Sequence, residues 1–168
     1  MAGWMAARRP DVDWVCPQLP ASPRDAIALA EASLRPGSAL IGSSLGGFDA
    51  TVLAERHGVP AVLLNPAVDP ARDLAARVGT LSAYHDPALA FEFTAAHVSE
   101  LREMTPAAIT RPERYAAVIA KGDELLDWCE MNARYSGAKV LLLEGSDHGL
   151  TDFEQHLPFI LRFLQLYP

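Results

Sequence analysis

Residues 39–50 read ALIGSSLGGFDA, and this stretch decides how the rest of the sequence is interpreted. The short apolar run at 38–42 predicts a β-strand, and the segment 46–57, which stops at Gly58, predicts a helix. Two serines and three glycines stand at the junction. A strand, then Gly-x-Ser-x-Gly, then a helix is typical of a nucleophile elbow, a tight turn that holds its central residue in a strained conformation.

The glycines identify Ser44 as the candidate nucleophile. In such a turn the residues two before and two after the centre must be small, and Gly42 and Gly46 meet this condition for Ser44. Ser43 has isoleucine and leucine at the same positions and fails. The Ser44 hydroxyl would stand at a helix N-terminus, whose dipole favours developing negative charge. The alternative is a glycine-rich turn without chemistry, whereas the spacings of a P-loop and of a dinucleotide-binding loop are absent.

A serine hydroxyl needs a base, and the chain order of this pattern puts the acid and then the histidine after the serine. His148 is the predicted base, because it lies in EGSDHGL (144–150), directly after the predicted last strand. The other histidines are predicted at a helix end, in an insertion or on a solvated helix face: His57, His85, His97 and His156.

Asp123 is the predicted acid of this set. It is the first carboxylate after the apolar run at 115–120 and its Gly122 turn, so it would project from the carboxyl end of the sheet. Asp127 stays open as the alternative acid, and otherwise it is an acid in the first turn of a helix. Asp147 neighbours the predicted base, and adjacent side chains in a loop rarely form the required pair.

Composition limits the function classes. The chain has 168 residues, which fits a single domain over 1–168, and half of them are hydrophobic. Its net charge of −7 argues against binding to nucleic acid. Two distant cysteines, Cys16 and Cys129, and the lack of a signal peptide predict a reducing, cytoplasmic location. No apolar run is long enough for a membrane span, no metal-ligand spacing is present, and the predicted chemistry needs no cofactor.

Apolar runs that alternate with helical patterns predict an α/β fold, with a parallel sheet of about five strands and helices on both faces. The strands are expected at 12–16, 38–42, 61–64, 115–120 and 138–144, and the helices at 22–33, 46–57, 127–135 and 152–167, the last bent at Pro158. Residues 66–114 break this rhythm and predict a helical insertion over one end of the sheet, with helices at 73–78 and 91–104 and turns at Asp86-Pro87 and Thr105-Pro106. The insertion is expected either to shape a substrate pocket or only to pack on the fold.

Five motifs together resemble the small YqiA-type esterases of the α/β-hydrolase superfamily: GSSLGGF (42–48), NPAV (65–68), PQLP (17–20), KGDELLD (121–127) and GSDHGL (145–150). The resemblance covers essentially the whole chain and includes a histidine that matches His97. It implies an α/β-hydrolase fold and hydrolysis of carboxylic esters or acyl thioesters, small-molecule substrates, with Ser44, Asp123 and His148 as a catalytic triad.

Two departures from this family pattern change what we expect. Asp49 stands where the family usually has an aromatic residue, which predicts an altered acyl-chain preference. The family also opens with a strand that ends in a His-Gly-Phe motif, and this chain lacks it, so we expect an N-terminally truncated form of the family. The loop after that strand supplies one oxyanion donor, which leaves the backbone amide of Leu45 as the assignable donor here. Loss of one donor typically costs about 10²–10³ in rate.

The sequence therefore predicts a serine hydrolase of esters or acyl thioesters that works through an acyl-enzyme. The alternatives are a non-catalytic binding or scaffold domain, and an enzyme impaired because half of its oxyanion hole is missing. A third possibility is transfer of the acyl group to an acceptor other than water. The acyl group, the leaving group and the oligomeric state are left open by the residues.

Overall fold

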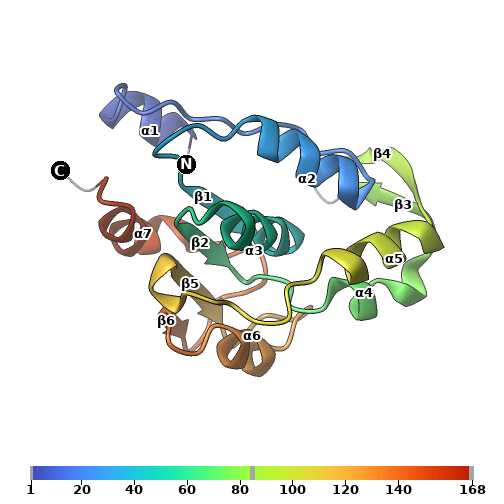
Figure 1. The fold of residues 1–168 in the computed structure, drawn as a ribbon. Coiled ribbons are helices and arrows are strands. Elements are labelled where there is room, and N and C mark those ends of the chain that lie inside the picture. Colours follow the sequence, from blue (N-terminus) through green and yellow to red (C-terminus); the bar gives the residue numbers. More distant parts are fainter. Residues whose placement is uncertain (1, 84–85, 167–168) are drawn as a thin grey trace.

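A four-stranded parallel sheet forms the centre of the molecule (Figure 1). The structure, a computed structural model, describes residues 2–83 and 86–166. In spatial order the strands are β1 (Leu40–Ser43), β2 (Ala61–Leu64), β5 (Tyr115–Ala120) and β6 (Lys139–Leu143). The register aligns Leu40 with Ala61, Ala61 with Tyr115, and Ala116 with Lys139. The carboxyl ends of all four strands therefore meet along one edge.

The two inner strands are buried along their whole length, whereas β1 and β6 are partly exposed. A strand covered on both faces reads as a continuous apolar run, and this explains why the ends of β2 and β5 match the prediction from the sequence residue for residue.

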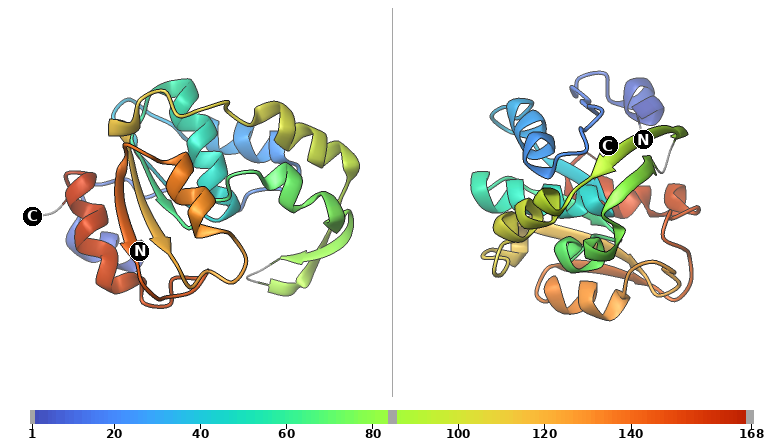
Figure 2. Two further views of the ribbon diagram at one scale, coloured as in Figure 1. Left: turned by 90° about the horizontal axis from the view of Figure 1, so that it is seen from below. Right: turned by 90° about the vertical axis from the view of Figure 1, so that its right-hand side faces the viewer.

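Helices cover both faces of the sheet, as predicted (Figure 2). On one face, α3 (Leu45–His57) and α6 (Trp128–Arg134) pack through Ala50, Ala54 and Met131 against side chains of β2 and β5. On the other face, Ile160 of α7 (Leu157–Phe163) packs against the same two strands. The helix α1 (Ala2–Arg8) lies against α7, where Met5 contacts Leu157 and Leu161.

The helix α2 (Pro23–Ala32) begins as its sequence predicts. The Ser22 hydroxyl accepts a hydrogen bond from the Asp25 amide, and Pro23 occupies the first turn, where no backbone donor is lost. Ile27 of α2 packs against Phe48, Val52 and Leu53 of α3. At its other end α3 stops at Gly58, whose φ of 69° is the left-handed conformation that glycine adopts most readily.

The segment 12–16, which we predicted as a strand, is not one, so the main sheet has four strands and not about five. These residues form no regular element, and β1 has no strand partner on its outer edge within the described residues. Val12 and Trp14 instead pack against the cluster formed by α1 and α7. An apolar run becomes a strand only when a neighbour accepts its backbone hydrogen bonds, and this run has none.

The insertion at 66–114 is only partly helical. It contains α4 (Pro70–Asp73), a short 3₁₀ turn (Ala75–Arg77) and α5 (Ala95–Met104), which cover the predicted helices only in part. Between them an antiparallel hairpin pairs β3 (Gly79–Ala83) with β4 (Asp86–Phe93). Residues 91–93 therefore belong to a strand, although the sequence predicted helix from 91 on, and the predicted turn at Asp86-Pro87 lies at the start of β4. The residues at 91–93 fit a helical period, but in the structure they alternate in exposure, as the residues of a strand do.

The last predicted helix is divided in two. A 3₁₀ segment, η3 (Phe153–His156), precedes α7, so Pro158 lies in the first turn of the α-helix instead of bending a longer one. His156 was expected on a solvated face, but it is buried, with an exposed fraction of 8%. Its Nε2 lies 3.1 Å from Asp152 Oδ2, within ion-pair distance but without the geometry of a hydrogen bond.

Asp49, in the second turn of α3, is an unusual residue for a helix that faces the core. Its exposed fraction is 7%, and no described residue donates a hydrogen bond to its carboxylate. Burial raises the pKa of the Asp49 carboxyl to about 7, because an ionised group loses its hydration there. This position of α3 is therefore an unfavourable place for a charge.

We predict that Asp49→Asn stabilises the protein at pH 8. In the unfolded chain Asp49 releases its proton near pH 4, so ionisation costs the native state stability as the pH rises from 4 towards 7. The asparagine variant escapes this cost, which is on the order of 4 kcal/mol above pH 7. Urea unfolding at pH 4 and pH 8 measures the difference, with the exposed Asp25→Asn as control. Parallel stability curves for wild type and Asp49→Asn would contradict the prediction.

Candidate functional site

Ser44 lies in a strained turn between β1 and α3. Its φ of 53° and ψ of −121° are rare for a residue with a side chain, as a nucleophile elbow requires. Its amide donates to the Leu64 carbonyl at 3.0 Å, and its carbonyl accepts from the Ala67 amide at 3.0 Å. The end of the neighbouring strand therefore holds the backbone of Ser44 from both sides and stabilises this conformation.

Glycines make the turn possible, but not all of those we expected. A Cβ at Gly42 would lie 2.0 Å from the carbonyl oxygen of Gly46, which no side chain tolerates. A Cβ at Gly46 would have no atom within 4 Å, so the steric argument from the sequence does not apply there. The constraint falls on Gly47 instead, where a Cβ would lie 2.7 Å from the Pro66 side chain.

His148 and Asp123 lie next to Ser44, each on a loop that follows a different strand. The Ser44 Oγ lies 2.9 Å from His148 Nε2, and His148 Nδ1 lies 2.9 Å from Asp123 Oδ2. The Asp123 side chain is completely buried, and its other oxygen accepts hydrogen bonds from the amides of Leu125 and Leu126. The carboxylate is thereby fixed in orientation, with one oxygen free for the imidazole.

The two other candidate acids have different partners. Asp127 caps α6, where its Oδ1 accepts from the Cys129 amide at 2.8 Å, and this is the structural alternative that the sequence left open. Asp147 accepts from the amide and the hydroxyl of Thr151, and these bonds lower the pKa of the Asp147 carboxyl. Neither forms a hydrogen bond with the imidazole of His148.

Asn65 and Glu124 hold the loop of His148, a role that the sequence did not predict for either residue. The buried side chain of Asn65 donates to the carbonyl oxygens of Asp147 and His148. The His148 amide donates to Glu124 Oε2 at 3.0 Å. Gly122 also matters, because a Cβ there would lie 2.1 Å from the Ser146 carbonyl oxygen. An Asn at the end of a buried strand, directly before proline, was the signal available in the sequence.

Three other histidines, His57, His97 and His156, have their partners outside this cluster. His57 pairs with Glu31 at the end of α3, as expected for a structural residue. His97 belongs to the capping box of α5, where its Nδ1 accepts from the Thr94 amide and its side chain contacts Phe93. The position of His85 lies outside the described residues.

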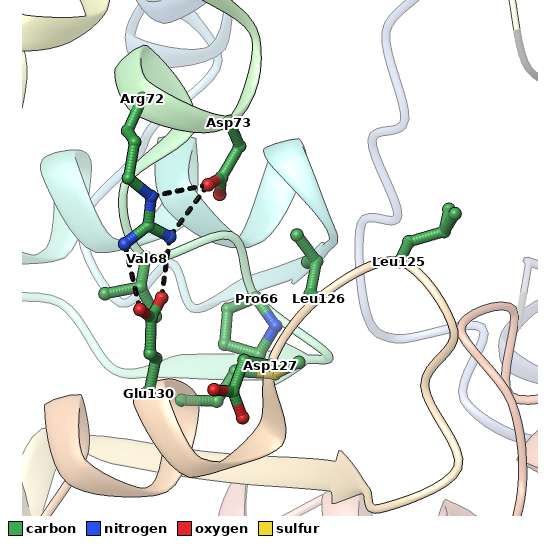
Figure 3. A pocket seen from close by; sticks show the side chains of 9 residues that line it. Pro66, Val68, Arg72, Asp73, Leu125, Leu126, Asp127 and Glu130 are labelled. Atoms are coloured by element: carbon green, nitrogen blue, oxygen red, sulfur yellow. Dashed lines mark hydrogen bonds and ion pairs between the residues drawn. The ribbon is translucent and has the colours of Figure 1, made fainter.

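A cavity of about 220 Å³ lies between α4 and α6 (Figure 3). Arg72 closes one wall, because its guanidinium binds Glu130 with two hydrogen bonds and also pairs with Asp73. Pro66 and Leu126 line the other side. Pro66 contacts Gly47 and the Leu126 amide donates to Asp123, but none of Ser44, His148 and Asp123 lines the cavity.

Across 2–83 and 86–166, no three side chains of histidine, cysteine, aspartate or glutamate gather as metal ligands would. Over the same ranges, every helix is too short or too polar to cross a lipid bilayer.

The family model of the Uncharacterised protein family (UPF0227) matches residues 1–165 of the chain. The match covers nearly the whole sequence, and it agrees with the resemblance that the five motifs indicate.

Solved structures with the same fold have little sequence identity to this chain. A protein from Agrobacterium vitis S4 is similar with a TM-score of 0.64 at 18% identity, over 85% of this chain and 69% of that one. The α/β-hydrolase domain-containing protein 10 from mouse has a TM-score of 0.60 at 16% identity, over 85% and 68%. The esterase domain of a Rhodothermus marinus protein has a TM-score of 0.54 at 18% identity, over 85% and 65%. These similarities establish the α/β-hydrolase fold.

Substitution by alanine is expected to affect the stability of the protein differently at Gly42 and at Gly46. We expect Gly42→Ala to destabilise the protein by about 3 kcal/mol, because the added methyl overlaps a backbone oxygen. Gly46→Ala meets open space and replaces glycine within a helix, so its stability changes by less than about 1 kcal/mol, in the favourable direction. Urea unfolding of both variants tests this, and equal losses of stability would refute the steric account.

Proposed function

The chain belongs to the Uncharacterised protein family UPF0227, and we propose that it is a serine hydrolase of carboxylic esters or acyl thioesters. In this proposal Ser44 is the nucleophile, His148 the general base and Asp123 the acid that orients the base. The observation that carries the proposal is a pair of 2.9 Å contacts, one from the serine hydroxyl to the imidazole and one from the imidazole to the carboxylate. Proteins of this fold include ones named as a hydrolase or an esterase, which supports the reaction class.

The proposed chemistry begins with a neutral imidazole that carries its proton on Nδ1. His148 Nδ1–H donates to Asp123, so Nε2 is free to accept the proton of the Ser44 hydroxyl as the oxygen attacks the substrate carbonyl. The proton then passes to the leaving alcohol or thiol, and an acyl-enzyme remains on Ser44. Water, activated by the same imidazole, releases the acid. The buried Asp123 stabilises the imidazolium formed at each step.

The oxyanion of the tetrahedral intermediate would lie at the N-terminus of α3. The amide of Leu45 belongs to the first turn of this helix and has no acceptor within it. It would donate to the developing negative charge, and the helix dipole would add to the stabilisation.

The substrate in this proposal is a small or medium ester with an apolar part. The side chains of Leu45 and Leu125 are exposed by 38% and 56%, although each lies within two residues of a member of the cluster. In this proposal the cavity of about 220 Å³ that Leu125 and Leu126 help to line takes a short acyl or leaving group, because it is smaller than most drug-sized binding sites.

Covalent labelling tests the nucleophile and the base. We expect a fluorophosphonate probe to label the wild-type protein at Ser44, and labelling to be lost in Ser44→Ala and reduced at least about 10³-fold in His148→Ala, because the hydroxyl is a poor nucleophile without its base. Mass spectrometry of the labelled peptide identifies the site. His57→Ala is the control, since this imidazole lies at the far end of α3.

The same experiment distinguishes the alternative functions. Absence of labelling in a folded wild-type protein would favour a binding or scaffold role. Labelling without turnover of p-nitrophenyl acetate in water, restored by an added alcohol or thiol, would favour acyl transfer to another acceptor.

The two neighbouring aspartates supply a matched pair of variants. Asp123→Asn keeps the size of the side chain but favours the wrong imidazole tautomer, so we expect kcat to fall by up to about 10⁴-fold. Asp127→Asn preserves a good helix cap and should leave kcat within about twofold. Steady-state kinetics with a p-nitrophenyl ester measures both, and a larger loss for Asp127→Asn would reassign the acid.

A further inference from the structure

Asn65 is a polar residue in the most buried part of the fold. It follows directly after β2, its exposed fraction is 0%, and its φ of 40° is left-handed. Such a conformation suits asparagine better than most residues with a side chain. Burial of a carboxamide is costly unless its donors and its acceptor are satisfied, so the partners of Asn65 show what it contributes.

The carboxamide of Asn65 joins two loops of the candidate site. Its Oδ1 accepts from the amide of Ala120, the last residue of β5, at 2.8 Å. Its Nδ2 donates to the carbonyl oxygens of Asp147 and His148, at 3.0 and 3.1 Å. These partners fix the orientation of the amide, because the opposite one would turn its oxygen towards two carbonyl oxygens and its NH₂ group towards an N–H.

The backbone around Asn65 holds the serine as well. The carbonyl oxygen of Leu64, the residue before it, accepts a hydrogen bond from the Ser44 amide, and the Ala67 amide donates one to the Ser44 carbonyl oxygen. One short segment, 64–67, therefore binds the backbone of Ser44 with its own backbone and the backbone of His148 with the Asn65 side chain. The distance between the two reacting groups is set through this segment.

We propose that Asn65 is a positioning residue of the reaction: its carboxamide holds the His148 backbone from the strand next to Ser44 and keeps the imidazole within bonding distance of the serine hydroxyl. This inference rests on the proposed function. The carboxylate of Glu124 also binds His148, because it accepts a hydrogen bond from the His148 amide, but Glu124 is exposed. Asn65 is buried in the core and donates to the His148 carbonyl oxygen.

The decisive variant is Asn65→Asp. Aspartate keeps the shape and tolerates the left-handed backbone, but an oxygen then faces the carbonyls of Asp147 and His148, and both donated hydrogen bonds are lost. We expect kcat for p-nitrophenyl acetate and the rate of fluorophosphonate labelling to fall about 10²-fold, the effect of a displacement of about 1 Å, with KM changed by less than about threefold.

The control is Tyr135→Phe, which also removes a buried hydrogen bond, to Thr51, but Tyr135 directly follows the C-terminus of α6 and lies outside the site. It should lower the unfolding midpoint and leave kcat unchanged. If Asn65→Asp loses stability as the control does but retains its kcat and labelling rate, the residue is structural and the positioning role is overturned.

Proton NMR provides a readout that needs no turnover. In the wild type we expect a low-field resonance from the His148 Nδ1–H that is bonded to Asp123, and in Asn65→Asp we expect that resonance to be lost. If the wild type is not labelled at Ser44, the proposed function fails, and this resonance still decides whether Asn65 positions His148. If Asn65→Asp does not fold, Asn65→Gly, which also suits the left-handed backbone, replaces it in both measurements.

Discussion

The backbone of Ser44 is fastened to the end of β2 by two hydrogen bonds, from its amide to the Leu64 carbonyl and from the Ala67 amide to its carbonyl. These bonds stabilise a conformation that a residue with a side chain rarely adopts. The same strand end reaches the opposite loop through the Asn65 carboxamide. The candidate site is therefore built around the strand between its components, since β2 separates the strand that leads to Ser44 from those that lead to Asp123 and His148.

The features that the sequence predicted well depend on local steric or hydrophobic rules. The strands β2 and β5 are buried on both faces, so each is a continuous apolar run whose ends can be located in the sequence alone. The turn at Ser44 is visible because only glycine fits at Gly42. The order of serine, acid and histidine along the chain then indicates which loops should meet, and the structure brings Asp123 and His148 together.

The features that the sequence did not predict depend on partners distant along the chain. Residues 12–16 have the composition of a strand but no paired neighbour. Residues 91–93 alternate over too short a stretch to be told from the helix that begins at Ala95. The role of Asn65 depends on carbonyls more than 80 positions away, and the burial of His156 depends on how α7 packs. None of these partners can be read from a local pattern.

The parallel order of the sheet also has a consequence for folding. Parallel neighbours need long crossover connections, and the hydrogen bond between Ser44 and His148 spans 104 positions of the chain. Contacts of such separation form late, because the chain entropy of closing the intervening loops is lost before the contacts compensate for it. We therefore expect the contact between Ser44 and His148 to form late in folding, together with completion of the parallel sheet.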